Sequence, residues 1–255
     1  MNQSRRHLTH FFSAIALLGL LISGIANAEE AAKAPEWKGE ISLGYILNQG
    51  NTKSESIKTG AKAKKDAEKW RISSKFESYS SKSQVEDDAG NKTTENTAEK
   101  YYVEGKYDYK FTEFNYFFTF ANYDDDRFTD FDYQASVSFG YGRRLIHTDV
   151  HEWDAEIGPG YRVNEFQNGD STEETIVRLA TTYNWKISDS AVFLQEVNVE
   201  SGEESTVSRS ETALTTQINK TLSLKIAHIV KYNDEVPPDT KHADQETIIS
   251  LLYSF

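Results

Sequence analysis

Residues 246–255, ETIISLLYSF, end the chain and decide its fold. Apolar side chains stand at every second position of this stretch: Ile249, Leu251, Tyr253 and Phe255. The alternate positions hold two serines and two apolar exceptions: Ser250, Ser254, Ile248 and Leu252. Because a strand turns successive side chains to opposite faces, this alternation predicts a strand with one apolar face. An apolar face that ends on a terminal phenylalanine is typical of a strand in contact with lipid.

The same alternation recurs upstream, in segments of about ten residues, which is the length of a strand that crosses an outer membrane. With the last segment, twelve strands are predicted: 37–47, 57–64, 70–77, 101–109, 114–123, 133–144, 152–163, 174–185, 191–199, 209–218, 222–232 and 246–255. Two are ambiguous in phase. The segment 114–123 has aromatic residues on both faces, and in 191–199 Val192 and Leu194 share a face with Glu196.

The connections between these strands alternate in length. Short turns are expected near 66–69, 110–113, 147–150, 186–190 and 219–221, and longer polar loops near 48–54, 80–98, 124–131, 164–173, 200–208 and 233–245. An even strand number with tight turns at one end and longer loops at the other is typical of bacterial outer-membrane barrels. We therefore predict an all-β fold, a transmembrane antiparallel up-and-down β-barrel of twelve strands over residues 37–255.

The N-terminus predicts export. Arg5 and Arg6 precede an apolar stretch, 11–25, and an Ala26-Asn27-Ala28 cleavage site, so residues 1–28 are expected to be a cleaved signal peptide. The alternative, an uncleaved anchor, would need a longer uninterrupted apolar stretch. A short periplasmic segment, 29–36, would then lead into the barrel, with both termini periplasmic and the protein in the cell outer membrane.

Charge and cysteine content exclude several classes of function. Removing residues 1–28 takes two basic residues from 28 and none of the 40 acidic residues, so the mature net charge is 26 − 40 = −14. Such an acidic chain is not expected to bind nucleic acid. The absence of cysteine excludes disulfides, thiolate metal sites and a cysteine nucleophile.

The tryptophans predict an interfacial belt. All four fall at the short-turn ends of the predicted strands: Trp37, Trp70, Trp153 and Trp185. The opposite strand ends carry tyrosines: Tyr45, Tyr79, Tyr123, Tyr133, Tyr161 and Tyr232. Indole and phenol rings prefer the headgroup level of a membrane, whereas a soluble core would not sort them by strand end.

The face opposite the apolar one carries the candidate lumen-lining residues: Lys58, Lys62, Lys64, Arg71, Lys75, Glu77, Glu104, Lys106, Asp108, Arg144, Asp154, Glu156, Arg162, Arg178, Glu196, Glu211, Lys225 and Lys231. In a closed barrel these side chains point inward. They would either fill the interior with cross-strand ion pairs or line a narrow aqueous pore. The basic excess within this set gives only a weak indication of anion preference.

One acidic run, 123–133, holds Asp124, Asp125, Asp126, Asp130 and Asp132 in a predicted loop. Carboxylates at this density could hold Ca²⁺ or Mg²⁺, but the full spacing of a calcium loop with its distal glutamate is missing. A solvated acidic loop is therefore the favoured interpretation, and no metal or other cofactor is predicted.

Four histidines follow the signal peptide, at 147, 151, 228 and 242. None combines with a serine and a carboxamide in a pattern expected of a lipase-like triad. We therefore expect no enzymatic activity, although a membrane enzyme with a nucleophile and base near the long-loop rim stays an alternative.

Four stretches resemble one family: GEISLGYILNQGNTKSESIKTG (39–60), DRFTDFDYQASVSFGYGRRLI (126–146), GPGYR (158–162), and the C-terminal part from TLSLKIAHIVKY to the end. Together they are similar to the salt-induced outer-membrane proteins, a family classed as a domain of unknown function. The resemblance covers essentially the whole mature chain. It implies a Gram-negative outer-membrane barrel linked to salt or envelope stress, with no established activity and no functional residues to transfer.

The expected function is a small passive channel or an envelope-stabilising barrel. A plugged barrel with a structural or surface-interaction role is the alternative. Expected partners are outer-membrane lipid, lipopolysaccharide and the barrel-assembly machinery, because the terminal Phe255 with its alternating apolar residues resembles the signal which that machinery recognises. The glycines of FGYG and GPGYR are interpreted as architecture that permits close strand approach.

Overall fold

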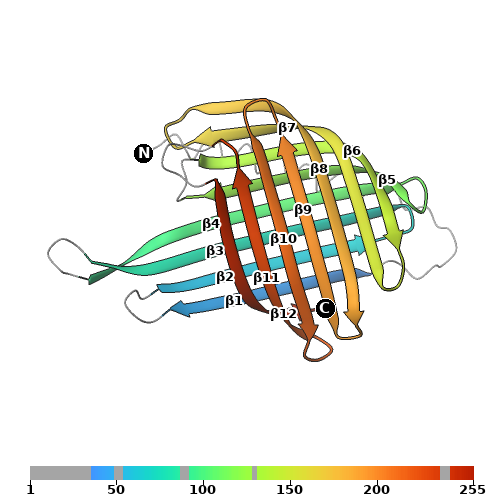
Figure 1. The fold of residues 1–255 in the computed structure, drawn as a ribbon, viewed down its shortest axis with the longest axis horizontal. Coiled ribbons are helices and arrows are strands. Elements are labelled where there is room, and N and C mark those ends of the chain that lie inside the picture. The colour runs from blue at the N-terminus through green and yellow to red at the C-terminus, as the bar shows by residue number, and fades with distance from the viewer. Residues whose placement is uncertain (1–35, 49–53, 87–91, 128–130, 236–241) are drawn as a thin grey trace. The chain divides into compact units, whose positions relative to one another are not determined.

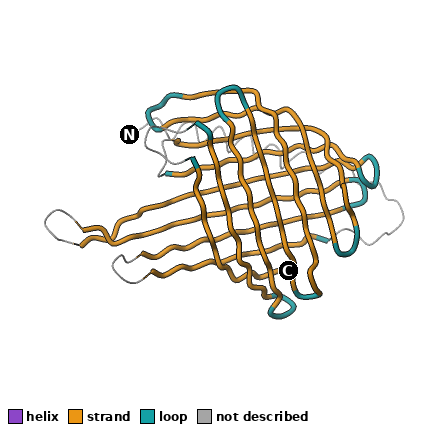
Figure 2. The backbone as a smooth tube through the Cα atoms, in the orientation of Figure 1, coloured by secondary structure: helices purple, strands orange, loops and turns teal. Residues whose placement is uncertain are grey.

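The computed structural model describes residues 36–48, 54–86, 92–127, 131–235 and 242–255. They form twelve strands: β1 (Trp37–Asn48), β2 (Ser54–Asp66), β3 (Trp70–Glu86), β4 (Lys92–Lys110), β5 (Asn115–Asp126), β6 (Phe131–His147), β7 (His151–Phe166), β8 (Ser171–Ser188), β9 (Ala191–Ser201), β10 (Thr206–Gln217), β11 (Leu222–Asn233) and β12 (Ala243–Ser254). Each strand is antiparallel to its sequence neighbours, and β1 pairs with β12, so the sheet closes (Figures 1 and 2). The predicted twelve-stranded antiparallel barrel is confirmed.

The predicted signal peptide, 1–28, and residues 29–35 lie outside the described residues. In the part of the chain that is described, no helix has the length and apolar character needed to cross a membrane. The strands themselves run from Trp37 to Ser254.

The wall alternates between a buried inner face and an exposed apolar outer face. Ser138 of β6 is fully buried, whereas the adjacent Phe139 is 63% exposed. Strands β5 to β8 repeat this two-residue alternation along much of their length. Since the exposed positions carry large apolar side chains such as Leu43, Ile157 and Leu179, the outer surface suits contact with lipid.

The predicted loops at one end of the barrel were too long. The segment 80–98 is mostly strand, because β3 extends to Glu86, β4 begins at Lys92, and these two residues are paired. Likewise 164–173 and 200–208 contract to the connections 167–170 and 202–205. Once a strand leaves the lipid both of its faces meet water, so it keeps its ladder hydrogen bonds but loses its apolar alternation. We call this end the hairpin end and the other the short-turn end.

The acidic run 123–133 is also more ordered than predicted. Asp124, Asp125 and Asp126 belong to β5 and Asp132 to β6, rather than to a loop. Asp130 lies outside the described residues. The run therefore contributes wall positions, two of which face the lumen as described below.

The seam between β1 and β12 is the shortest pairing in the barrel. It runs over Glu40–Gly44 and Ser250–Ser254. The Phe255 N–H donates to the Gly39 carbonyl (3.0 Å), and the Gly39 N–H donates to the Phe255 carbonyl (2.9 Å), which extends the seam by one pair. The Phe255 ring packs so closely on Gly39 that a Cβ there would overlap it. The last residue thus helps to close the sheet.

Strands β6 and β7 approach unusually closely at two glycines. A Cβ on Gly140 would lie 2.6 Å from the Gly158 Cα, and a Cβ on Gly158 would lie 2.7 Å from the Gly140 Cα. Each would also overlap a carbonyl oxygen of the facing strand, at Ile157 and Phe139 respectively. Backbone atoms cannot move away as a flexible side chain can, so these positions of FGYG and GPGYR require glycine.

The Gly158→Ala variant is expected to lower the free energy of unfolding by about 1–3 kcal/mol, the usual range for overpacking against fixed atoms. Gly105→Ala is the matched control, because it is also a strand glycine but a Cβ there meets nothing within 4 Å. Urea unfolding of both refolded variants, followed by tryptophan fluorescence, measures the difference. Equal stability of the two variants would contradict the close approach.

Deleting Phe255 is expected to reduce the yield of folded, heat-modifiable barrel, because the deletion removes two backbone hydrogen bonds from the shortest seam. The control is Phe114→Ala, which truncates another exposed aromatic side chain at the short-turn end. Gel migration with and without boiling, after expression in cells, measures insertion. Insertion of the truncated chain at the wild-type level would refute the role given to this residue.

Candidate functional site: a charged lumen

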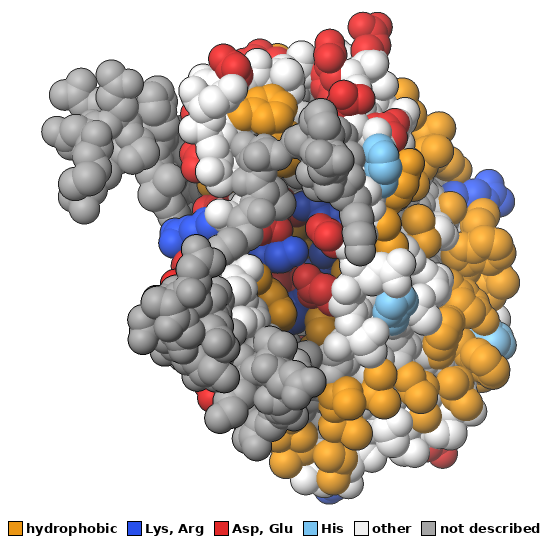
Figure 3. Space-filling view, turned by 60° about the vertical axis from the view of Figure 1, so that its left-hand side comes forward, with side chains coloured by type: hydrophobic (Ala, Val, Ile, Leu, Met, Phe, Trp, Pro, Cys, Tyr) orange, Lys and Arg blue, Asp and Glu red, His pale blue; other side chains and the backbone are white. Residues whose placement is uncertain are grey.

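The lumen is lined by ionisable side chains from every part of the wall. The structure places all eighteen of the residues named from the sequence on the inner face, where each joins an ion pair or lines a cavity. Figure 3 looks toward the hairpin end and shows basic and acidic side chains in its central hollow, with hydrophobic side chains on the outer wall. The interior is thus polar where the exterior is apolar.

A cluster that we call the waist links distant strands at mid-height: Lys75, Glu77, Tyr102, Arg209 and Glu211. The Lys75 Nζ lies 3.0 Å from a Glu211 carboxylate oxygen, and Arg209 lies 2.7 Å from Glu77. Both pairs join β3 to β10, which are not neighbours in the sheet. The Arg209 guanidinium also lies 5.0 Å from the Tyr102 ring centre. The waist therefore crosses the lumen rather than following its wall.

A second cluster surrounds Glu156 on the wall of β4 to β8. Its carboxylate accepts hydrogen bonds from Lys106, from the Tyr116 hydroxyl (2.8 Å) and from Arg178 (2.9 Å). The Arg178 guanidinium lies 4.0 Å from the Phe120 ring centre. Three donors thus satisfy one buried carboxylate, as a charge removed from water requires.

Arg71 completes this side of the lumen. It bonds Asp108 (2.6 Å) on the neighbouring strand and reaches Asp154 (3.0 Å) on β7. Arg144 approaches Asp66 near the short-turn rim at 3.8 Å. Arg71 and Arg144 therefore both lie within ion-pair distance of carboxylates from other strands.

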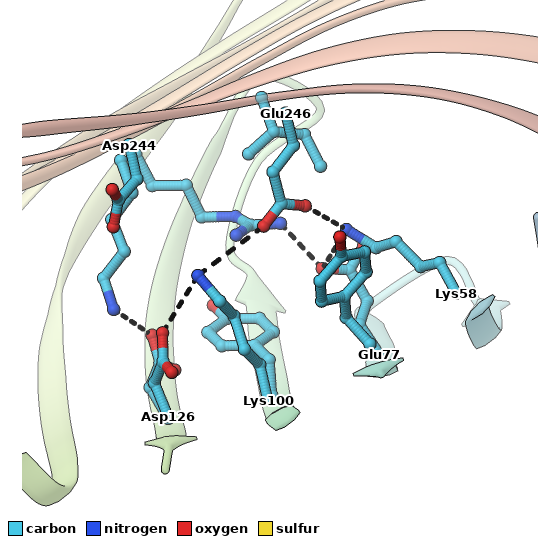
Figure 4. Close-up of a pocket in the computed structure, with 12 residues that line it drawn as sticks. Lys58, Glu77, Lys100, Asp126, Asp244 and Glu246 are labelled. Atoms are coloured by element: carbon cyan, nitrogen blue, oxygen red, sulfur yellow. Dashed lines mark hydrogen bonds and ion pairs between the residues drawn. The ribbon is translucent and has the colours of Figure 1, made fainter. Parts of the chain in front are cut away.

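Near the hairpin end a third group of ion pairs narrows the mouth (Figure 4). The Lys58 Nζ lies 3.3 Å from Glu246, and the Lys100 Nζ lies 2.9 Å from Asp126 and 3.8 Å from Glu246. Lys231 bonds Asp124 at 2.6 Å. The two aspartates of the acidic run that face inward are therefore partners of lumen lysines.

Arg162 fastens one connection of the hairpin end to the wall. Its guanidinium bonds Glu174 (2.6 Å) and donates to the carbonyl (2.6 Å) and hydroxyl (2.8 Å) of Ser205. The Glu204 N–H donates to the same Glu174 (2.9 Å). The connection 202–205 is thereby held against the inner face, and Arg162 is 2% exposed.

The free space in the lumen is divided unequally. On the short-turn side of the waist lies a cavity of about 770 Å³, which reaches the rim at Lys220, Thr221 and Phe255. On the hairpin side two recesses of about 50 Å³ each remain, and both are lined by Tyr102 and Arg209. The waist therefore separates the cavity of about 770 Å³ on the short-turn side, which we call the vestibule, from a hairpin side that side chains almost fill.

Several lumen residues were missed from the sequence: Tyr102, Arg209, Lys100, Asp124, Asp126, Glu174, Glu200 and Glu246. Arg209 lies two residues before Glu211 on β10 and therefore points inward as Glu211 does, so the alternation of the sequence could have predicted its place in the lumen. Tyr116, Phe118 and Phe120 face inward and are almost fully buried, which resolves the ambiguous phase of 114–123. Because these side chains are aromatic, the sequence alone could not distinguish them from residues that face lipid.

The other named residues occupy the short-turn end and the outer wall. Trp37 and Trp70 begin β1 and β3, and Lys65 lies between their rings, 5.7 Å and 5.8 Å from the centres. Trp153 and Trp185 lie at the same end, on β7 and β8. The side chains of the last strand's outward face are all exposed: Ile249, Leu251, Tyr253 and Phe255.

Comparison with known proteins identifies relatives. A family model described as a protein of unknown function, DUF481, matches residues 41–255. The uncharacterized protein YdiY of Escherichia coli (strain K12) is 30% identical over 227 residues, which cover 88% of this chain and 85% of that protein. Both matches span most of the barrel.

Solved structures share the architecture. An outer-membrane channel from Pseudomonas putida F1 is similar with a TM-score of 0.52 and 7% identity, over 91% of this chain and 100% of that chain. The NanC porin is similar with a TM-score of 0.51 and 11% identity, over 84% and 98%. Identities this low show the fold alone, which is that of an outer-membrane β-barrel.

Replacing Glu211 by Gln is expected to destabilise the barrel by about 3 kcal/mol, because it leaves Lys75 and Lys225 without their shared carboxylate in a buried site. Glu196→Gln is the matched control, since Glu196 is the cross-strand neighbour of Glu211 but forms no ion pair among the described residues. Urea unfolding of the refolded proteins gives the two values. A loss for Glu196→Gln equal to that for Glu211→Gln would contradict the pairing.

Proposed function

The chain belongs to the DUF481 family of proteins of unknown function, and from that premise we propose that it acts as an envelope-stabilising outer-membrane barrel whose lumen is closed at the waist. The observation that carries this proposal is the division of the lumen by Lys75–Glu211 and Arg209–Glu77, which join opposite parts of the wall. An open diffusion pore would need a continuous water-filled path past these side chains.

The energetics of the waist support a closed resting state. Lys75 and Glu211 are both nearly inaccessible to solvent, and separating them would leave the buried Lys75 ammonium only the longer contact to Glu77 at 3.5 Å. Glu211 would keep its pair with Lys225. Breaking a buried ion pair costs several kcal/mol, so a spontaneous opening would be rare. Pairs that connect distant strands also resist distortion of the barrel, which suits a stabilising role.

A small passive channel is the second candidate, and the vestibule of about 770 Å³ favours it. In that case the waist would be a selective constriction, and its ion pairs would rearrange as solute passes. A deletion strain discriminates the two, because a channel predicts changed solute permeability, whereas a stabilising barrel predicts an altered envelope or salt-stress phenotype with unchanged permeability.

We also propose that the barrel has no catalytic role and that its partners are lipid, lipopolysaccharide and the assembly machinery. The Thr247 Oγ1 lies 2.9 Å from the His228 Nδ1, but both side chains lie on the outward face. Within the described residues no carboxylate or carboxamide bonds that imidazole, so the geometry of a triad is incomplete. The exposed apolar wall supports the assignment of lipid as the main contact.

Planar-bilayer recordings test the closure. We expect no discrete conductance steps from the refolded wild type. We expect clear steps from a variant in which all five waist residues (Lys75, Glu77, Tyr102, Arg209 and Glu211) are replaced by Ser, because it removes both cross-lumen pairs. The double variant Lys38→Ser, Lys220→Ser, on the vestibule rim, should behave as the wild type. Steady porin-like conductance of the wild type, or a silent waist variant that still migrates as a folded barrel, would overturn the proposal.

A further inference from the structure

The vestibule contains charged side chains that make no direct ion pair. Lys62 on β2 and Glu196 on β9 both line the cavity, and neither forms an ion pair within the described part of the chain. Most of the other mid-lumen charges are engaged at 2.6–3.0 Å. Both side chains are half-exposed, so an ammonium and a carboxylate without ion-pair partners are accessible to a solute in one cavity.

The strand register shows how these charges are arranged. Lys62 stands opposite Lys75, and Glu196 stands opposite Glu211, so each wall has one pair of like charges. The other cross-strand neighbours of the two lysines are carboxylates, Glu40 beside Lys62 and Glu104 beside Lys75. Lys75 and Glu211 bond each other across the lumen at 3.0 Å, and Lys225 takes the second oxygen of Glu211 at 2.6 Å. That arrangement leaves the Lys62 ammonium on one side of the bridge and the Glu196 carboxylate on the other.

The cavity has a suitable size and an entrance. Its volume of about 770 Å³ falls within the range of small-molecule sites, roughly 300–1,000 Å³. Lys38, Lys220 and Ser254 lie at its rim, so a solute can enter from the short-turn end without passing the waist. Phe120 and Val197 add apolar surface inside.

We propose that the vestibule binds a small zwitterionic solute, with the anionic group of the solute at Lys62 and its cationic group at Glu196. A zwitterion satisfies both spare charges at once and leaves the net charge of the lumen unchanged. A simple anion would satisfy Lys62 alone and would face the carboxylates of Glu196, Glu104 and Asp154 on the other side. This binding goes beyond the proposed structural role and does not depend on whether the waist conducts.

Glu40 is a nearby carboxylate that could compete for Lys62, in addition to Glu211, which attracts the same ammonium from farther away. It is the cross-strand partner of Lys62 on β1, but no ion pair joins them in the described residues. If the Lys62 ammonium were held mainly by Glu40, removing that carboxylate would free it for the solute. Glu40→Gln is therefore expected to leave zwitterion binding unchanged or to strengthen it.

Isothermal titration of the refolded full-length barrel in detergent tests the proposal, with glycine, γ-aminobutyrate and ε-aminocaproate as probes and with butyrate and butylammonium as single-charge controls. We expect binding of the zwitterions with one preferred chain length, and at least about tenfold weaker binding of butyrate and butylammonium. Lys62→Gln and Glu196→Gln should each weaken the preferred zwitterion by about tenfold or more, because each removes one charge-assisted contact.

Lys220→Gln is the matched control, because it removes another unpaired ammonium from the same cavity but at its rim. It should bind as the wild type does. Unchanged affinity in both Lys62→Gln and Glu196→Gln, butyrate binding as tight as that of the zwitterions, or no binding of any probe would overturn the proposal. Heat-modifiable migration shows that each variant is folded, and bilayer recordings remain a separate measure of the waist.

Discussion

Every backbone N–H and C=O group in the wall must find its partner within the wall, because lipid offers none. A sheet meets this requirement only by closing on itself, and here the closure depends on the short seam of β1 and β12. The carbonyl and amide of Phe255 extend that seam to Gly39. Closure then fixes the chemistry of both faces, since one side of every strand meets lipid and the other meets the lumen.

The interior follows from the same constraint. Twelve strands enclose a space wider than that of a packed eight-stranded barrel but far narrower than that of a large porin. Long charged side chains from opposite walls can therefore reach one another, as Lys75 and Glu211 do at 3.0 Å. Aromatic rings fill part of the remaining width, and Arg178 stacks on Phe120 at 4.0 Å. The lumen is thus cross-linked by polar contacts where a soluble protein would have an apolar core.

The sequence was sufficient to predict the fold, because lipid on one side and water on the other impose a two-residue period that survives in the sequence. It predicted strand number, phase and the inward face of residues such as Arg71 and Glu156. It failed where the period ends. The extensions of β3 and β4 meet water on both faces, so apolar and polar residues do not alternate along them, and they were predicted as loops.

Other features of the site were beyond reach from sequence for a different reason. Which lysine meets which carboxylate depends on barrel width and shear, and no spacing along the chain links Lys75 to Glu211 or Arg209 to Glu77. The inward aromatic residues of β5 were ambiguous because an apolar side chain fits both lipid and a crowded lumen. The approach of Gly140 to Gly158 likewise needed the paired strands.

The placing of charge within the lumen combines repulsion with attraction. Like charges directly opposite each other on neighbouring strands are destabilising. Lys62 beside Lys75 and Glu196 beside Glu211 are such pairs, but Glu40 stands on the other side of Lys62 and Glu104 on the other side of Lys75. The Lys75–Glu211 pair joins the two walls, and Lys62 and Glu196 face the cavity open to the short-turn end. One level of charged residues therefore supplies both a cross-lumen contact of the waist and part of the charged lining of the vestibule.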